Sequence, residues 1–255
     1  MRRMIRGMAA AFSTYSALPV RLTQWKDEDF YYAPVFFPWV GAVIGATVFL
    51  WQLICKKLGI GVICDVCVTV VLPVILTGGI HLDGFMDTSD ALSSFADREK
   101  RLKILSDPHI GAFSVIRLAV LGCLYFGIWS QLYCSEIIAP CCGVYFFSRI
   151  LCVLSIYYFP KAKEGGMLGG FFKPDKKRAV TAACVIEGIL CISFWLILKP
   201  AAALLCVFTG CMMMIIYKRM SVKCFGGITG DTSGFFLSVT ELVMLAALML
   251  SQCLF

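Results

Sequence analysis

Long apolar runs alternate with shorter polar segments along most of this 255-residue chain. Each run is close to the roughly 20 residues that an α-helix needs to cross the hydrocarbon core of a bilayer. The pattern predicts an all-α, polytopic membrane helix bundle of about seven transmembrane helices in a single domain, residues 1–255. Only Lys199 and Pro200 separate the fifth run from the sixth, which fits a tight hairpin or one broken helix. The runs cover residues 33–55, 60–80, 110–132, 137–159, 179–198, 201–217 and 235–255.

The longer polar segments lie at residues 1–30, 81–109, 160–178 and 218–232. Within the first, residues 4–18 combine apolar positions with a basic start, and Pro19 follows them. This pattern predicts an amphipathic helix on the membrane surface, ended by the proline.

Composition supports membrane insertion. The chain is 60% hydrophobic and 15% charged, with a mean hydropathy of +0.84, whereas soluble domains are about 45–50% apolar and about 25% charged. Most of the 14 cysteines lie inside apolar runs, where we expect small apolar side chains rather than disulfides. Cys64 and Cys67 form a C-x-x-C pair, but no second pair with zinc spacing accompanies them.

The basic residues predict an orientation. If the N-terminus is cytoplasmic, eighteen of the 23 Lys and Arg residues fall in cytoplasmic segments and three in outer segments. Such an imbalance is typical of the positive-inside rule. We therefore expect a multi-pass protein of the cell membrane, with its N-terminus inside and a cytoplasmic active face built from segments 81–109, 160–178 and 218–232. The same rule accounts for the formal charge of +7 without a nucleic-acid partner.

The first chemical motif is GGIHLDGFMDTSDALSSF, residues 78–95. Asp83, Asp87 and Asp90 follow at spacings of four and three, which place their side chains on one face of a helix. Three acids on one face repel one another, and a hard cation such as Mg²⁺ offsets that repulsion because carboxylate oxygens suit it. A solvated helix end just outside the membrane is the alternative.

The second motif is GGITGDTSG, residues 226–234. Its flexible backbone, the carboxylate of Asp231 and the hydroxyls of Thr229 and Thr232 suit a phosphate held with its metal. The alternative is a glycine-rich turn that opens the last helix, with Asp231 as its N-cap.

Two arginines and two glutamates lie inside apolar runs, where such residues normally face the protein interior or a wet cavity. Arg149 can meet a phosphate, and Glu241 follows Asp231 by two to three helical turns, so it can point into the same cavity. An ion pair that joins two helices is the competing explanation for each. His81, two residues before Asp83, is the better of the two histidines for proton transfer. The four residues are Arg117, Arg149, Glu187 and Glu241.

These residues resemble the membrane-bound cobalamin synthases, the adenosylcobinamide-GDP ribazoletransferases, over nearly the full length of the chain. The similarity is carried by His-Leu-Asp-Gly at 81–84 with its two following aspartates, and by Thr-Gly-Asp-Thr at 229–232. Counterparts also occur at Phe12, Leu18-Pro19-Val20, Phe37-Pro38, Val40-Gly41, Gly45, Asp107, Ser148-Arg149, Glu164-Gly165 and Glu241.

The resemblance implies the last step of nucleotide loop assembly in vitamin B12 biosynthesis. Adenosylcobinamide-GDP and α-ribazole, or its 5′-phosphate, would give adenosylcobalamin, or its 5′-phosphate, and GMP, with Mg²⁺ as cofactor. It leaves a homo-oligomer, or association with other enzymes of the pathway, open. The implied catalytic residues are His81, Asp83, Asp87 and Asp90; the metal ligands are Asp83, Asp87, Asp90, Asp231 and Glu241; the substrate contacts are Asp107, Arg149, Glu164, Thr229, Gly230 and Thr232.

The sequence departs from the family pattern at two places. Pro108-His109 stands where the family usually has Ser-Arg, and residues 13–17 lack the arginine that often precedes Leu-Pro. Two other functions stay open. A CDP-alcohol-type phosphotransferase also uses helical aspartates, but its Asp-Gly is usually followed by Ala-Arg, not Phe85-Met86. A cation-coupled transporter would show internal repeats and helices broken at the bilayer centre.

Overall fold

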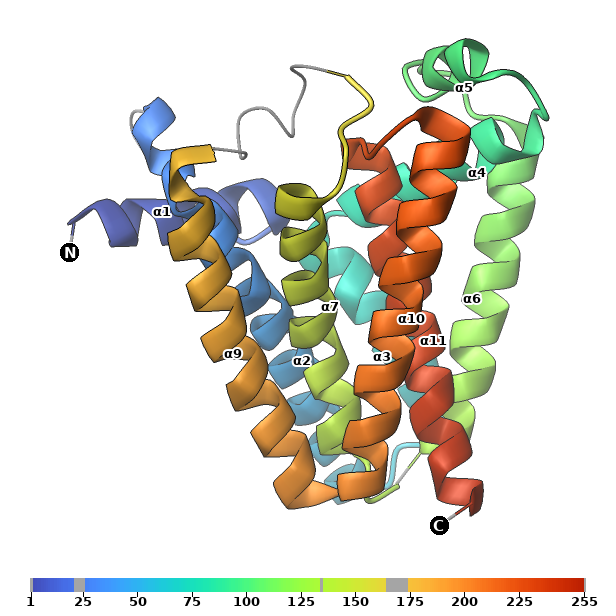
Figure 1. The fold of residues 1–255 in the computed structure, drawn as a ribbon. Coiled ribbons are helices and arrows are strands. Elements are labelled where there is room, and N and C mark those ends of the chain that lie inside the picture. The colour runs from blue at the N-terminus through green and yellow to red at the C-terminus, as the bar shows by residue number, and fades with distance from the viewer. Residues whose placement is uncertain (1, 21–25, 134, 164–173, 255) are drawn as a thin grey trace.

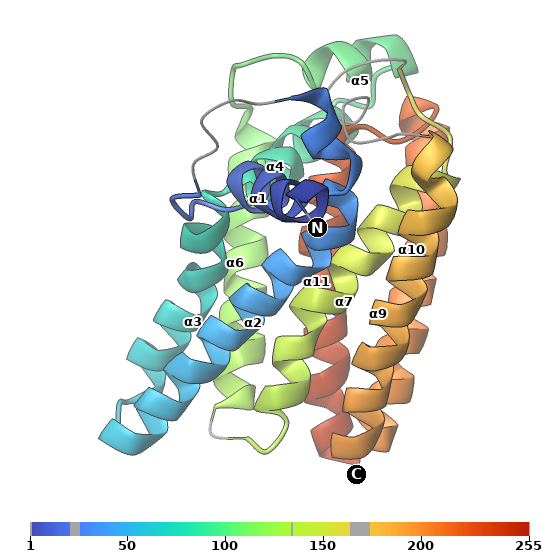
Figure 2. The same ribbon diagram turned by 90° about the vertical axis from the view of Figure 1, so that its left-hand side faces the viewer.

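A computed structural model describes residues 2–20, 26–133, 135–163 and 174–254. Long helices run side by side through the bundle, and shorter helices lie across one end (Figures 1 and 2). The long ones are α2 (Ala33–Leu58), α3 (Val62–Thr77), α6 (Ala112–Leu132), α7 (Ile138–Tyr158), α9 (Lys177–Leu198), α10 (Pro200–Phe225) and α11 (Gly230–Leu254). The others are α1 (Arg2–Tyr15), η1 (Asp27–Tyr31), α4 (Ile80–Ser93), α5 (Arg98–Ile104) and η2 (Pro174–Lys176).

Six of these helices are long and apolar enough to cross a membrane, and α3 joined to α4 makes a seventh candidate. The predicted helical membrane bundle is therefore confirmed. The predicted surface helix at residues 4–18 corresponds to α1, which lies across the long helices in Figure 1. The fifth and sixth runs form a hairpin, since α9 and α10 meet at Lys199 and run side by side.

The second predicted span, residues 60–80, ends earlier than expected. Helix α3 stops at Thr77, and α4 leaves it at an angle of 94°. Gly78 and Gly79 both have positive φ, 63° and 79°, which a residue without a Cβ adopts readily. The chain therefore turns sharply, and the aspartate motif lies on a helix that crosses the end of the bundle.

Two predicted polar loops are largely helical. Residues 81–109 contain α4 and α5, and helix α10 continues to Phe225 through part of the predicted loop 218–232. Helix α11 already begins at Gly230, so the connection is only 226–229. Charged residues can continue a helix past the bilayer, because its backbone hydrogen bonds stay internal whatever the solvent.

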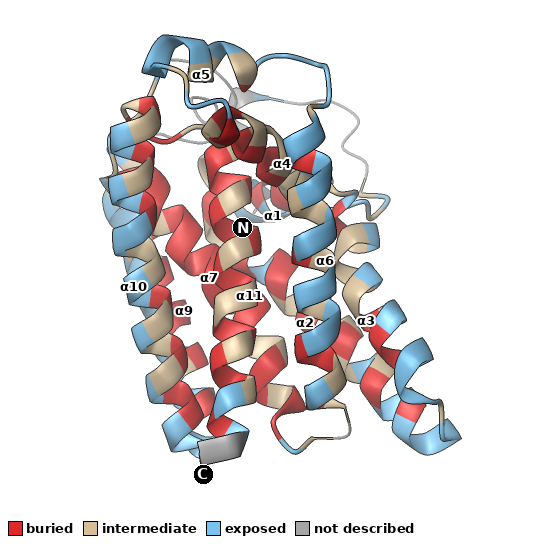
Figure 3. Cartoon of the chain, turned by 90° about the vertical axis from the view of Figure 1, so that its right-hand side faces the viewer, coloured by how far each residue is buried: buried red, intermediate tan, exposed pale blue. Residues whose placement is uncertain are grey.

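Helix α7 lies at the centre of the bundle and is mostly buried, while α3, α6 and α10 expose one side (Figure 3). Helix α2 packs closely on α7 because Gly41 and Gly45, four residues apart, leave no side chain between the backbones. A Cβ at Gly41 would come within 2.1 Å of the Tyr145 carbonyl oxygen. Small residues at this spacing let membrane helices approach closely.

The connections 93–98, 104–112, 158–160 and 225–230 lie at one end of the bundle, and the C-terminus lies at the other (Figure 1). At this end Ile228 accepts from Ala162 and donates to Pro160, with N···O distances of 3.1 and 2.8 Å. The Arg98 side chain donates to the Phe225 carbonyl at 2.8 Å. These bonds join the three polar segments that the sequence predicts on one face.

The cysteines match the prediction for a membrane interior. Twelve of them are free thiols in the described part of the chain, and Cys64 and Cys67 are among these.

Candidate active site

Helices α4 and α11 bring the two sequence motifs together. Gly84 lies against the main chain of Asp231, and Gly234 lies against the main chain of His81. A Cβ on Gly84 would come within 2.7 Å of the Asp231 carbonyl oxygen, and one on Gly234 within 2.9 Å of the His81 carbonyl oxygen. Phe85 and Phe235 stack beside this crossing, with ring centroids 5.4 Å apart. The glycines of each motif therefore make room for the other motif.

Asp83 and Asp231 line the same cavity at this crossing, which has about 600 Å³ of empty space. His81 lines it as well, together with Tyr15 of the surface helix α1 and Cys152 of α7. Asp83 is exposed, whereas Asp231 is half-buried. The cavity thus carries one carboxylate from each motif.

Asp87 lies one helical turn after Asp83 and is half-buried. Its pKa is raised to about 6, first by burial and then by the negative charges of Asp83 and Asp231, with a smaller effect of Asp90. Carboxylates that raise one another's pKa lie close together without enough positive charge between them. A divalent cation supplies such charge, and carboxylate oxygens are the ligands that Mg²⁺ prefers.

The residues fit a metal by donor chemistry, although they do not form a closed set of ligands. In the described ranges, no group of three or more His, Cys, Asp or Glu side chains is close enough to hold a metal ion. The metal site of Asp83, Asp87, Asp90, Asp231 and Glu241 stays a prediction.

Asp90 has a structural partner that the sequence did not reveal. One carboxylate oxygen accepts from the Gly111 amide at 2.8 Å and the other from the Ser114 amide at 2.9 Å. Both amides belong to the start of α6, where Gly111 offers no side chain as a cap. Asp90 thus caps α6 from α4 and fixes the two helices to each other.

Arg149 and Glu241 form a buried ion pair between α7 and α11. The Arg149 Nη1 donates to Glu241 Oε1 at 2.7 Å, and the Ser148 hydroxyl donates to the same oxygen at 3.0 Å. The alternative of an ion pair that joins two helices is therefore present for both residues. A phosphate contact by Arg149 and a metal bond by Glu241 stay predictions.

The other glutamate and arginine inside the apolar runs, Glu187 and Arg117, also join helices. Trp39 of α2 donates through Nε1 to Glu187 of α9 at 2.8 Å. Arg117 of α6 donates to the Ser89 carbonyl of α4 at 3.4 Å.

The hydroxyls of the second motif organise the start of α11. The Thr232 hydroxyl accepts from the Thr229 amide at 2.8 Å, and the Thr229 hydroxyl accepts from the Thr232 amide at 3.1 Å. Thr232 is fully buried and also contacts the Tyr217 hydroxyl at 3.1 Å. Thr229, rather than Asp231, therefore caps the helix, while Asp231 lines the cavity in the first turn. Their substrate contacts, and that of Gly230, stay predictions.

Asp107 is exposed on the connection between α5 and α6. Its carboxylate accepts from the His109 amide at 3.0 Å and contacts the His109 ring at 2.6 Å. These hydrogen bonds lower the pKa of Asp107. His109 is therefore the partner of the predicted contact Asp107. Glu164 lies outside the described residues.

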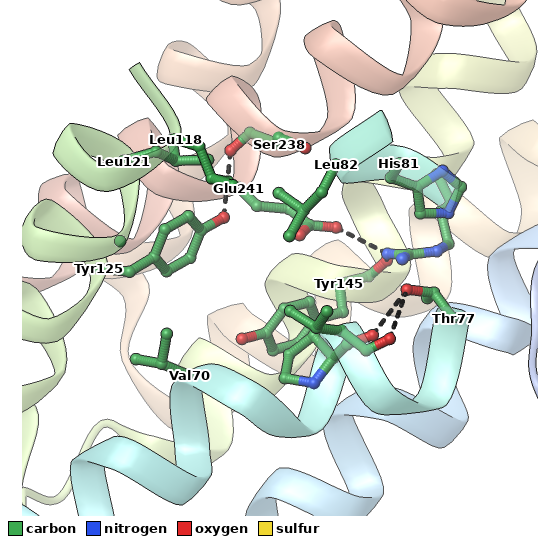
Figure 4. Close-up of a pocket in the computed structure, with 14 residues that line it drawn as sticks. Val70, Thr77, His81, Leu82, Leu118, Leu121, Tyr125, Tyr145, Ser238 and Glu241 are labelled. Atoms are coloured by element: carbon green, nitrogen blue, oxygen red, sulfur yellow. Dashed lines mark hydrogen bonds and ion pairs between the residues drawn. The ribbon is translucent and has the colours of Figure 1, made fainter. Parts of the chain in front are cut away.

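A second cavity, with about 630 Å³ of empty space, lies beside the first and is lined by α3, α4, α6, α7 and α11 (Figure 4). Tyr125, Tyr145, Arg149 and Glu241 line it, and His81 lines both cavities. Tyr125 and Tyr145 are not among the residues predicted from the sequence, because each is a single tyrosine in an apolar run. A single polar group inside an apolar run is the sequence feature that could have indicated them.

Comparison with known proteins identifies the family. Residues 7–249 match the family model described as cobalamin-5-phosphate synthase. A protein of Lachnoclostridium phytofermentans named adenosylcobinamide-GDP ribazoletransferase is 37% identical over 95% of this chain and 92% of its own length. A Clostridium botulinum protein of the same name is 30% identical over the whole of both chains. No solved structure matches the chain. With its two motifs joined at one cavity and this match over nearly its whole length, the chain belongs to the cobalamin-5-phosphate synthase family.

Proposed function

We propose that this membrane protein is an adenosylcobinamide-GDP ribazoletransferase. A ribose hydroxyl of α-ribazole, or of its 5′-phosphate, attacks the phosphorus that carries the cobinamide arm. An O–P bond forms to the ribose, the pyrophosphate bond to GMP breaks, and the hydroxyl proton leaves to a base. The products are adenosylcobalamin, or its 5′-phosphate, and GMP.

The observation that carries this proposal is the convergence of Asp83 and Asp231 on one cavity. Phosphoryl transfer needs little covalent help from the protein, but it needs positioning and compensation of negative charge. A bound cation supplies this compensation. Carboxylates from two distant motifs can hold one, because Gly84 and Gly234 let α4 and α11 cross closely.

We propose that Asp83, Asp87 and Asp231 hold Mg²⁺, with Asp90 and Glu241 as the remaining predicted ligands. When bound, Mg²⁺ would polarise the phosphoryl group and stabilise the charge on the leaving GMP. Asp90 already caps α6 and Glu241 already pairs with Arg149. We therefore rank Asp83, Asp87 and Asp231 above them as ligands.

We further propose that His81, or a carboxylate not engaged by metal, takes the hydroxyl proton. The His81 ring packs beside Tyr15 and Phe37, with ring centroids 6.3 and 5.8 Å away, so its orientation is set by packing. Its Nε2 is buried and has no hydrogen-bond partner. The imidazole is neutral and has one free nitrogen, but burial and the nearby Arg149 disfavour the charged imidazolium, so a carboxylate is the stronger base of the two candidates.

A turnover assay tests the proposed function. Protein in liposomes receives adenosylcobinamide-GDP, α-ribazole and Mg²⁺, and chromatography follows GMP and cobalamin. The wild type should release GMP, and Asp83→Asn should lose at least about 100-fold of the rate. Asp175→Asn, an exposed aspartate paired with Lys176 on η2, is the matched control and should stay active. A folded wild type that releases no GMP, with or without the ribazole phosphate, would refute the proposal.

A further inference from the structure

The cavity between α3, α6 and α7 contains polar atoms that lack partners. His81 Nε2, Tyr145 Oη and Arg149 Nε are each buried without a hydrogen-bond partner, and their three side chains all line this cavity (Figure 4). A buried polar group without a partner costs about 1–3 kcal/mol, so three around one space call for an explanation. A ligand with hydrogen-bonding groups supplies one.

The rest of the lining is apolar and aromatic. Leu82, Leu118 and Leu121 contribute aliphatic surface, and Tyr125 adds an aromatic ring whose hydroxyl is already used, donating to the Ser238 carbonyl at 3.1 Å. Small-molecule sites are typically apolar pockets with a few convergent polar groups. The lining therefore suits a flat aromatic heterocycle, because an alkyl chain would leave the polar atoms unpaired.

The position of the cavity links it to the reaction. His81 lines this cavity and also the cavity that contains Asp83 and Asp231. A molecule whose aromatic part fills the cavity lined by Tyr145 and Arg149 can therefore pass His81 and present its polar part to the carboxylates. Of the two substrates in the proposed reaction, α-ribazole has this shape: a benzimidazole base joined to a ribose.

We propose that the cavity lined by Tyr125, Tyr145 and Arg149 is the binding site for the aromatic base of ribazole, and that Tyr145 is a specificity-determining residue. This rests on the proposed function. The Tyr145 hydroxyl donates to the one ring nitrogen of the base that does not carry the ribose. The ribose then lies beside His81, with its hydroxyl directed to Asp83 and Asp231.

Tyr145→Phe removes only the unpartnered hydroxyl. It should raise KM for α-ribazole about tenfold and leave KM for adenosylcobinamide-GDP unchanged, the size expected for one hydrogen bond. Tyr133→Phe is the matched control, because the Tyr133 hydroxyl donates to the Ile60 carbonyl at the opposite end of the bundle. An unchanged KM for α-ribazole in Tyr145→Phe would overturn the role of Tyr145.

A substrate analogue makes the test specific. The indole riboside has the shape of the benzimidazole riboside but a C–H in place of the acceptor nitrogen. Wild type should prefer the benzimidazole riboside about tenfold in kcat/KM, and Tyr145→Phe should treat the two alike. The same preference in both proteins would contradict the hydrogen bond.

Filling the cavity gives an independent test. Gly122 of α6 lines the cavity, and a Cβ there would meet no atom within 4 Å. Gly122→Leu should therefore raise KM for α-ribazole at least tenfold, while Gly127→Leu, equally open but outside the cavity, should not. Equal behaviour of the two variants would overturn the site.

Calorimetry separates this inference from the proposed function. If wild type binds α-ribazole and Gly122→Leu does not, but no GMP forms, the cavity is supported and the reaction is wrong. If GMP forms and both variants bind α-ribazole like wild type, the reaction stands and the cavity is wrong.

Discussion

Gly84 of α4 lies directly against the main chain of Asp231 of α11, so closely that a Cβ would come within 2.7 Å of the Asp231 carbonyl oxygen. The two residues are far apart in sequence and belong to the two motifs that carry the candidate chemistry. Their contact is what puts the carboxylates of Asp83 and Asp231 on one cavity.

The first prediction concerns this contact. Gly84→Ala should lower kcat/KM for GMP release at least tenfold, because overpacking forces α4 away from α11 at a cost of about 1–3 kcal/mol. Gly188→Ala on α9 is the control, since a Cβ there meets no atom within 4 Å. Circular dichroism should show both variants helical. Full activity in Gly84→Ala would mean that the close approach is dispensable.

The second prediction concerns the buried ion pair. Arg149→Met or Glu241→Gln alone should destabilise the protein by about 3–5 kcal/mol, since each leaves a buried group without its partner. The double variant Arg149→Met/Glu241→Leu should regain most of the melting temperature in detergent.

Turnover of the double variant then separates two roles. Restored activity would show that the pair only joins α7 to α11, whereas restored stability without activity would show that Arg149 or Glu241 contacts substrate or metal. Single variants that melt like wild type would contradict the importance of the pair.

The third prediction is a pH dependence. Because the pKa of Asp87 is raised from 3.8 to about 6, its protonated form contributes stability that is full below pH 3.8 and lost as the pH rises through about 6. In EDTA, the wild-type melting temperature should therefore fall relative to that of Asp87→Asn across this range. Mg²⁺ at pH 7.5 should raise the wild-type melting temperature more than that of Asp87→Asn. The same pH dependence of the melting temperature in both proteins would argue against a raised pKa of Asp87.

The fourth prediction separates two roles of Asp90. Asp90→Asn keeps one oxygen as an acceptor for the start of α6, whereas Asp90→Ala removes the cap at a cost of about 1 kcal/mol. If Asp90 only caps α6, Asp90→Asn should keep most of its activity and Asp90→Ala should melt earlier. Loss of GMP release in a stable Asp90→Asn would show a direct catalytic or metal role.

The fifth prediction is the orientation in the membrane. The basic segments gather at one end of the bundle, and the positive-inside rule directs that end to the cytoplasm. Alkaline phosphatase fused after residue 255 should then be active, while a fusion within residues 94–97 should not. The reverse pattern would place the carboxylate cavity on the outer side.

The sequence alone was enough to predict the membrane spans, the polar end of the bundle and the family. Apolar run length and loop charge predict the number of spans and the gathering of polar segments at one end, because bilayer thickness and helical rise leave little freedom. The spacing of Asp83, Asp87 and Asp90 predicts a shared helix face for the same local reason. The family follows from the two motifs together.

How these parts meet depends on the tertiary structure. The 94° turn after Thr77 carries the aspartate helix across the bundle, and the crossing at Gly84 sets it on α11. It likewise decided that Asp90 caps α6, that Glu241 pairs with Arg149, and that Tyr145 lines a cavity next to His81. Local periodicity specifies which side of a helix is polar, but the partner on that side depends on contacts between residues far apart in sequence, which no local pattern records.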